Sequence, residues 1–211
     1  MDDVGRLQQA LLRTYRIEMP LDVRDFLLSD SEVAIALAPT AAAAREMLLV
    51  RQQADALEVS LYLDAADLQA LADAGPATAV DDPGLDRFCR IAEGVSHFVL
   101  LAWRALRHWP ISRFELELQA EVDKFMVCLV AGVGDGPELV EALFVRSRLR
   151  DELSATERER YRSASSLARD YCQSLGSKDR DDLLEDARRF YRFGQREKVG
   201  HIAGLRARRA A

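Results

Sequence analysis

The sequence has few of the residues that usually carry recognisable chemistry. Its 211 residues include only three histidines and three cysteines, and no apolar segment approaches the roughly 20 residues of a membrane span. Cys89, Cys128 and Cys172 are far apart and form no CxxC pair, so neither a zinc knuckle nor a redox dithiol is predicted. We expect three reduced thiols buried in the core of a cytosolic protein.

Other absences exclude further classes of protein. The sequence contains no Walker A lysine pattern and no Rossmann glycine fingerprint after a strand. With 11 glycines, 6 prolines and a hydrophobic share of 49%, the chain is neither collagen-like nor wholly disordered. It starts with the acidic segment MDDVGR, which no apolar run follows, so no secretory signal is predicted. We therefore expect a cytoplasmic protein without membrane association.

Hydrophobic periodicity predicts the fold class. Leu57, Val59, Leu61 and Leu63 alternate with polar residues, which predicts a half-buried strand. The apolar segment 47–51 precedes it after a short polar connection, so a β-hairpin is expected near 46–64. Helical spacing dominates the chain after residue 84. The predicted fold is mainly α, a helical bundle with a small N-terminal α+β portion that contains the β-hairpin.

The same patterns suggest the domain organisation. A segment with two prolines and two glycines, residues 74–84, is the best candidate for a linker. We divide the chain into an α+β portion over 1–75, a helical bundle over 84–205 and a flexible basic tail over 206–211. Ser112 with Glu115, and Ser154 with Glu157, have the spacing of capping boxes. Helices are predicted over 4–15, 21–28, 66–72, 85–107, 112–131, 137–149, 154–175, 181–193 and 197–205.

The two central helices carry polar side chains on faces that are otherwise apolar. On a helical wheel, three ionisable residues of the helix 85–107 share one strip, and three more flank the core face of the next helix. Ionisable groups at such positions are costly unless they meet partners. The short connection makes the two helices antiparallel, so the two groups face each other. The residues of this polar cluster are Glu93, His97, Arg104, Glu117, Glu121 and Lys124.

Two interpretations of this polar cluster remain open. Spacings of i,i+4 place Glu93 with His97, and Glu117 with Glu121, one turn apart on a face, as ligands of a divalent metal ion would be. A buried salt-bridge network with Arg104 and Lys124 is the favoured interpretation, because Lys124 supplies the positive charge that a metal would supply. In addition, Glu93 and His97 are one residue further apart than in the Glu-x-x-His motif of bundle metal sites.

Charge is distributed unevenly along the chain. The net charge is -6. From residue 187 onward eight basic residues and one acid give 8 - 1 = +7, so the rest of the chain carries -6 - 7 = -13. Basic residues alternate with aromatic ones, a pattern typical of surfaces that bind single-stranded nucleic acid. An amphipathic helix with its aromatic side chains packed on the bundle is favoured instead, because an acidic body repels polyanions. The basic residues concerned are Arg188, Arg189, Arg192, Arg196 and Lys198.

These observations lead to three hypotheses about function. The first is a cytoplasmic, non-enzymatic interaction or regulatory protein, with the bundle as scaffold and the basic C-terminal region as the docking element for a protein partner. The alternative is a metal-dependent, hydrolase-like enzyme with one divalent ion at Glu93, His97, Glu117 and Glu121. The third, nucleic-acid binding through the C-terminal region, is disfavoured by the acidic body. No cofactor other than that ion is expected.

Overall fold

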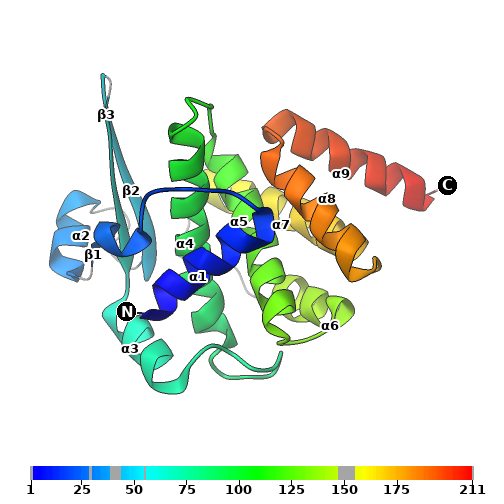
Figure 1. Ribbon diagram of the computed structural model, residues 1–211, viewed down its shortest axis with the longest axis horizontal. Coiled ribbons are helices and arrows are strands. Elements are labelled where there is room, and N and C mark those ends of the chain that lie inside the picture. The colour runs from blue at the N-terminus through cyan, green and yellow to red at the C-terminus, as the bar shows by residue number, and fades with distance from the viewer. Residues whose placement is uncertain (1, 29, 39–43, 55, 147–154, 211) are drawn as a thin grey trace.

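The computed structural model describes residues 2–28, 30–38, 44–54, 56–146 and 155–210. Helices make up most of these residues, and one small sheet lies at the side of the molecule (Figure 1), which confirms the predicted fold class. Along the chain the elements are α1 (Asp2–Tyr15), the 3-10 helix η1 (Val23–Phe26), β1 (Leu27–Leu28), α2 (Ser31–Leu37), β2 (Glu46–Gln53), β3 (Ala56–Leu63), α3 (Ala65–Ala74), α4 (Leu85–Ala105), α5 (Arg113–Ala131), α6 (Gly136–Val140), the π-helix η3 (Glu141–Val145), α7 (Ala155–Leu175), α8 (Arg180–Arg192) and α9 (Gln195–Ala210).

The predicted hairpin is present. Antiparallel pairing joins β2 to β3, from Glu46 opposite Leu63 to Gln53 opposite Ala56. The sheet order is β1-β3-β2, with β1 parallel to β3. The outer half of the hairpin, next to the turn, is mostly exposed, whereas the residues of the inner half are buried or half-buried. The inner half therefore places the first residue of β2 against the helices.

The segment 21–28 is not the helix that the sequence predicted. The Asp22 side chain accepts a hydrogen bond from the Arg24 backbone N–H and caps only the short helix η1. Leu27 and Leu28 then pair with β3 as the strand β1. The backbone of Leu27 and Leu28 therefore pairs with β3 and does not form the helical hydrogen bonds that the apolar spacing predicted.

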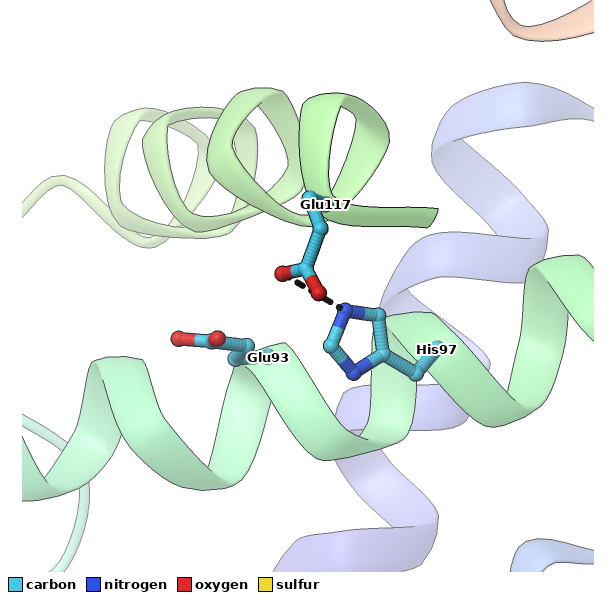
Figure 2. Close-up of side chains that lie close together, drawn as sticks. All are labelled: Glu93, His97 and Glu117. Carbon is cyan, nitrogen blue, oxygen red and sulfur yellow. Dashed lines mark ion pairs between the residues drawn. The ribbon is translucent and has the colours of Figure 1, made fainter. Parts of the chain in front are cut away.

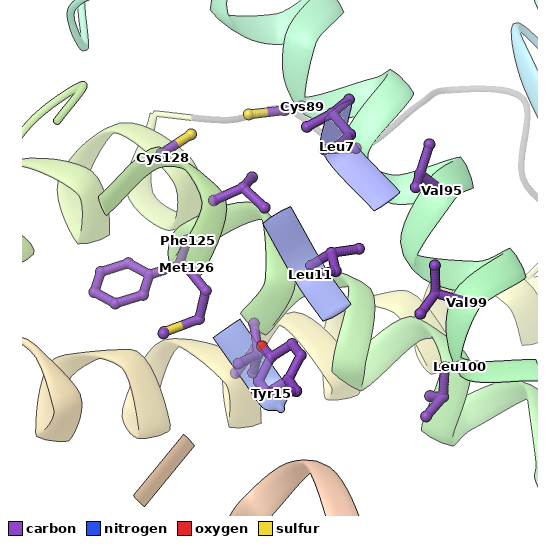
Figure 3. Close-up of a cluster of buried hydrophobic side chains, with 14 of the residues drawn as sticks. Leu7, Leu11, Tyr15, Cys89, Val95, Val99, Leu100, Phe125, Met126 and Cys128 are labelled. Carbon is purple, nitrogen blue, oxygen red and sulfur yellow. The ribbon is translucent and has the colours of Figure 1, made fainter. Parts of the chain in front are cut away.

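Helix α4 is the centre of the core. Most of its residues are buried, and it packs against the sheet, α1, α3 and α5. Figure 3 shows Leu7, Leu11 and Tyr15 of α1 in the same apolar cluster as side chains of α4 and α5. A helix buried on most of its circumference can hold polar side chains only where neighbouring elements supply partners.

Helix ends follow the capping signals in part. Ser112 accepts the hydrogen bond of the Glu115 N–H at 3.0 Å, and Gly132 ends α5 in the left-handed conformation with a φ of 76°. The cap predicted at Ser154 lies outside the described residues.

Residues 206–210, where a flexible tail was predicted, continue α9. Arg206 binds the side chain of Asp170 on α7, and Arg209 binds that of Gln173. None of the described helices is both long and apolar enough to cross a membrane.

Candidate functional site

Three of the four predicted metal ligands converge between α4 and α5. Glu93 and His97 lie one turn apart on α4, and Glu117 faces them from α5 (Figure 2). One ligand atom from each of the three lies within 4.8 Å of the other two. Within the described part of the chain, this is the one group of three such side chains close enough to share an ion. We call these three residues the metal cluster.

The His97 imidazole is held at one ring nitrogen and unsatisfied at the other. Nδ1 lies 3.2 Å from Glu46 Oε1. Nε2 points toward Glu117, at 3.8 Å from Oε2, and has no hydrogen-bond partner among the described residues (Figure 2). The side chain is buried, with 6% of its surface exposed. A buried nitrogen without a partner is unusual and indicates that a proton or an ion belongs there.

Glu46 reaches His97 because α4 has a glycine where the sheet crosses it. A Cβ atom on Gly94 would lie 2.8 Å from Glu46 Cγ and 2.9 Å from Leu63 Cδ2. Such distances are below those of real contacts, so the hairpin approaches α4 only over a glycine. No role was predicted for Glu46 from the sequence. The available signal was an acidic residue on the strand face that Leu48 and Val50 make apolar.

Lys124 lies between the carboxylates of Glu93 and Glu121. Its Nζ donates to Glu121 Oε1 at 2.7 Å and to Glu93 Oε2 at 3.2 Å. Burial alone would lower the pKa of Lys124, but the two carboxylates outweigh burial and raise it. Glu121 does not belong to the metal cluster, whereas Glu93 belongs to it and also binds Lys124. Both predicted interpretations, a salt bridge and a group of potential ligands, are therefore present side by side.

Burial and mutual repulsion keep protons in the cluster. Burial alone would lower the pKa of His97. The carboxylates of Glu46, Glu117 and Glu93 outweigh burial and raise this pKa to about 9. Burial raises the pKa of Glu117 to about 7. At neutral pH the cluster therefore holds an imidazolium and a carboxyl of Glu117 that is about half protonated, and a metal ion would displace these protons.

A cavity lies beside the cluster. Its volume is about 860 Å³, and its walls come from α4, α5, η3, α7 and the segment before α4. Glu93, Glu121 and Lys124 line it, as does Tyr161, whose phenol lowers the pKa of Glu117. Burial raises the pKa of Tyr161, so its phenol stays protonated. A small molecule in the cavity would therefore meet one edge of the metal cluster.

Arg104 does not join this cluster. It lies two turns further along α4 and donates to Glu115 Oε1 at 2.7 Å and to the Phe193 carbonyl at 2.5 Å. The fully buried Lys198 of α9 lies 3.5 Å from the same carboxylate. The capping box predicted for Ser112 and Glu115 therefore forms only on the Ser112 side, because the Glu115 side chain points into the core. Sequence reasoning missed the role of Glu115 in this ion pair.

A second buried polar group is centred on Asp123, which the sequence analysis did not single out. Its carboxylate accepts hydrogen bonds from Tyr15 at 2.5 Å, Ser96 at 2.6 Å and Gln119 at 2.7 Å. Lys198 donates to Gln119 at 2.8 Å and so connects Asp123 to the Arg104–Glu115 pair. None of these residues lines the cavity beside the metal cluster. The role of the group is to hold α1, α4, α5 and α9 together.

The basic C-terminal residues do not form one surface. Arg188 donates to the carbonyl of Thr14, and Arg192 to those of Tyr15 and Arg16, at the end of α1. Of the other predicted docking residues, Lys198 is buried, whereas Arg189 and Arg196 are exposed.

The aromatic side chains of this region are in the core. Tyr191 stacks on Tyr15 with ring centroids 4.0 Å apart, and Phe190 stacks on Tyr171 at 3.9 Å. Both are fully buried, so they offer no platform on which bases could stack.

Comparison of this chain with protein-family models, with curated proteins and with solved structures finds no match.

Proposed function

We propose that this protein is a metal-dependent enzyme that holds one divalent transition-metal ion between α4 and α5 and acts on a small molecule in the adjacent cavity. The observation that carries the proposal is the buried Nε2 atom of His97. It has no hydrogen-bond partner among the described residues, and it lies in the same group of atoms as the carboxylates of Glu93 and Glu117.

The donor set supports a catalytic rather than a structural ion. One imidazole nitrogen and two carboxylates suit zinc, manganese or iron, and three protein ligands leave a position open for water or substrate. The carboxylate of Glu46 at Nδ1 would keep the neutral imidazole in the tautomer whose Nε2 lone pair faces the ion. Glu121 and Lys124 would remain paired beside it.

The surrounding side chains support hydrolytic chemistry. A metal ion lowers the pKa of a bound water and so supplies a nucleophile at neutral pH. Lys124 is held in its charged form by Glu121 and Glu93, and Tyr161 in its protonated form by burial. Both line the cavity and are donors for negative charge that develops on a substrate.

Metal content after dialysis against metal-free buffer tests the proposal. We expect wild-type protein to retain or take up about one equivalent of zinc or manganese. Glu93→Gln and Glu117→Gln should lose it, because an amide is a poor ligand for these ions. Glu121→Gln is the matched control, since it changes a carboxylate of the same network outside the metal cluster. Absence of metal uptake by the wild type, or equal uptake by all three variants, would refute the proposal.

An interaction role is the second candidate, and a different surface favours it. Large apolar side chains are exposed on α2 and on the outer half of the hairpin, at the same side of the molecule (Figure 1). They are Val33, Ile35, Leu37, Val50 and Leu57. Large apolar side chains that are exposed to solvent are candidates for contact with a protein partner. Partner capture that is lost in Leu37→Ser/Val50→Ser/Leu57→Ser but kept in Arg189→Ala/Arg196→Ala would support docking through the hairpin side, and the reverse would support the predicted C-terminal docking.

A further inference from the structure

We infer that the cavity beside the metal cluster recognises a phosphoryl group of its substrate through Arg162 and Arg169 of α7. The inference rests on the proposed function, because it names the substrate class on which the bound ion would act. Its basis is a pair of guanidinium groups in the cavity wall that bind no other side chain or carbonyl in the part of the chain that the structure describes.

These two arginines differ from the other arginines that line the cavity. Arg90 donates to Asp67 at 2.8 Å, and Arg146 lies 3.9 Å from Glu141. Arg162 and Arg169 are exposed and form no ion pair or hydrogen bond with the described residues. A guanidinium presents five N–H donors in a planar fork, which fits the oxygens of a phosphoryl group.

The spacing along α7 places both groups on one face. Arg162 and Arg169 are seven residues apart, which is about two helical turns and about 10 Å. Ser165 lies between them on the same face and also lines the cavity. Arginine side chains are long enough to converge from both ends on an anion seated above the serine hydroxyl. A single phosphoryl group therefore fits this wall.

The remaining charges of the cavity favour an anion at α7 and exclude one elsewhere. Asp81 and Asp86 line the cavity from the segment before α4 and from its first turn, and would repel an anion there. Asp82 is engaged by the backbone N–H groups of Thr78 and Gly84. The buried ammonium of Lys124 is paired with Glu121 and Glu93 and offsets one of these two negative charges next to the substrate. The phosphoryl group is thereby directed between α7 and the metal cluster.

Binding of inorganic phosphate to the full chain, measured by calorimetry without added metal, tests the inference. Arg162→Ala/Arg169→Ala should weaken binding about tenfold or more, since each lost charged hydrogen bond is worth more than a factor of ten. Arg180→Ala/Arg196→Ala removes the same charge from exposed positions outside the cavity and should leave the affinity unchanged. All four side chains are exposed, so both variants should retain the fold, which circular dichroism checks.

Three outcomes would overturn the inference. They are no phosphate binding by the wild type, equal weakening in both double variants, and binding of acetate as tight as that of phosphate. Zinc titration of the same samples separates this inference from the proposed function. Zinc binding without phosphate binding overturns the phosphoryl assignment alone, and phosphate binding without zinc binding overturns the metal-dependent enzyme alone.

Discussion

Glu46 and His97 are 51 residues apart in the sequence, yet their side chains lie 3.2 Å apart in the core. The contact joins the first residue of β2 to the middle of α4, where Gly94 allows the strand to approach. The position of the His97 ring thus depends on the hairpin as well as on its own helix. The behaviour of the metal cluster should therefore respond to changes in strand packing.

Gly94→Ala should destabilise the protein by about 1–3 kcal/mol, because the new methyl group would collide with Glu46 and Leu63. It should also lower the pKa of His97, since the carboxylate that raises it most would move away. Urea unfolding and a histidine NMR titration measure the two effects. Gly200→Ala is the control. That glycine lies in α9 with open space around it, so stability should rise by about 0.5–1 kcal/mol. Equal effects of the two substitutions would show that the sheet does not press on α4.

Stability should fall as the pH rises through the titration of His97. The folded-state pKa is raised from 6.5 to about 9, so the folded state binds the proton more tightly than the unfolded state. The contribution is full below pH 6.5 and is lost as the pH rises through 9, and it amounts to about 3 kcal/mol. The difference in unfolding free energy between wild type and His97→Gln, measured from pH 6 to 10, should shrink over that window. A constant difference would contradict the raised pKa.

Glu117 should act in the same direction at lower pH. Its pKa rises from 4.5 to about 7 on folding, so the folded state again holds the proton more tightly. This contribution is present below pH 4.5 and is lost as the pH rises through 7. Glu117→Gln should remove this part of the pH dependence. It should also shift the part that belongs to His97 to lower pH, because the Glu117 carboxylate is one of the groups that raise the His97 pKa. If the profile between pH 4.5 and 7 is the same in both proteins, another group is responsible.

Metal binding should release protons. The imidazolium of His97 and the partly protonated carboxyl of Glu117 must both lose their protons to coordinate an ion. At pH 7 we expect between one and two protons per zinc ion, obtained from calorimetry in buffers of different ionisation enthalpy. The apparent affinity should rise up to about pH 9 and then level off. Zinc binding without proton release would place the ion away from His97.

Removal of Glu115 should be among the most damaging single substitutions. Glu115→Ala would leave Arg104 and Lys198 buried without their carboxylate, at a cost of about 3–5 kcal/mol. Glu58 pairs with Arg51 on the exposed part of the hairpin, and Glu58→Ala should cost about 0–1 kcal/mol. Thermal unfolding of the two variants compares them directly. Similar costs would mean that the buried pair contributes no more than a surface pair.

Patterns local in sequence were enough to predict much of the fold. Alternation at 57–63 predicted β3, and the Ser112 and Gly132 signals predicted the ends of α5. Predictions failed where tertiary pairing outweighed local preference. Leu27 and Leu28 have helical spacing with their neighbours but pair with β3 instead. A helical wheel contains no information about such strand partners.

In the candidate site too, contacts between neighbouring helices were predicted and contacts with distant elements were not. The i,i+4 rule placed Glu93 with His97, and the short turn brought Glu117 opposite them. The helical wheel also grouped Arg104 with them, because a wheel shows the angle of a side chain around the helix axis and not its position along the axis. Glu46 and Lys198 come from elements distant in sequence, so no pattern within α4 or α5 could have supplied them.

The contact between α1 and α8 has a consequence for the order in which the chain acquires its structure. Tyr15 stacks on Tyr191, and the arginines at 188 and 192 bind the carbonyls that end α1. During synthesis α1 emerges long before α8, because the residues that cover its last turn lie more than 170 positions later in the sequence. Contacts of such long sequence separation form late and slow folding. The apolar face of α1 therefore stays uncovered on that side in the nascent chain until α8 has left the ribosome.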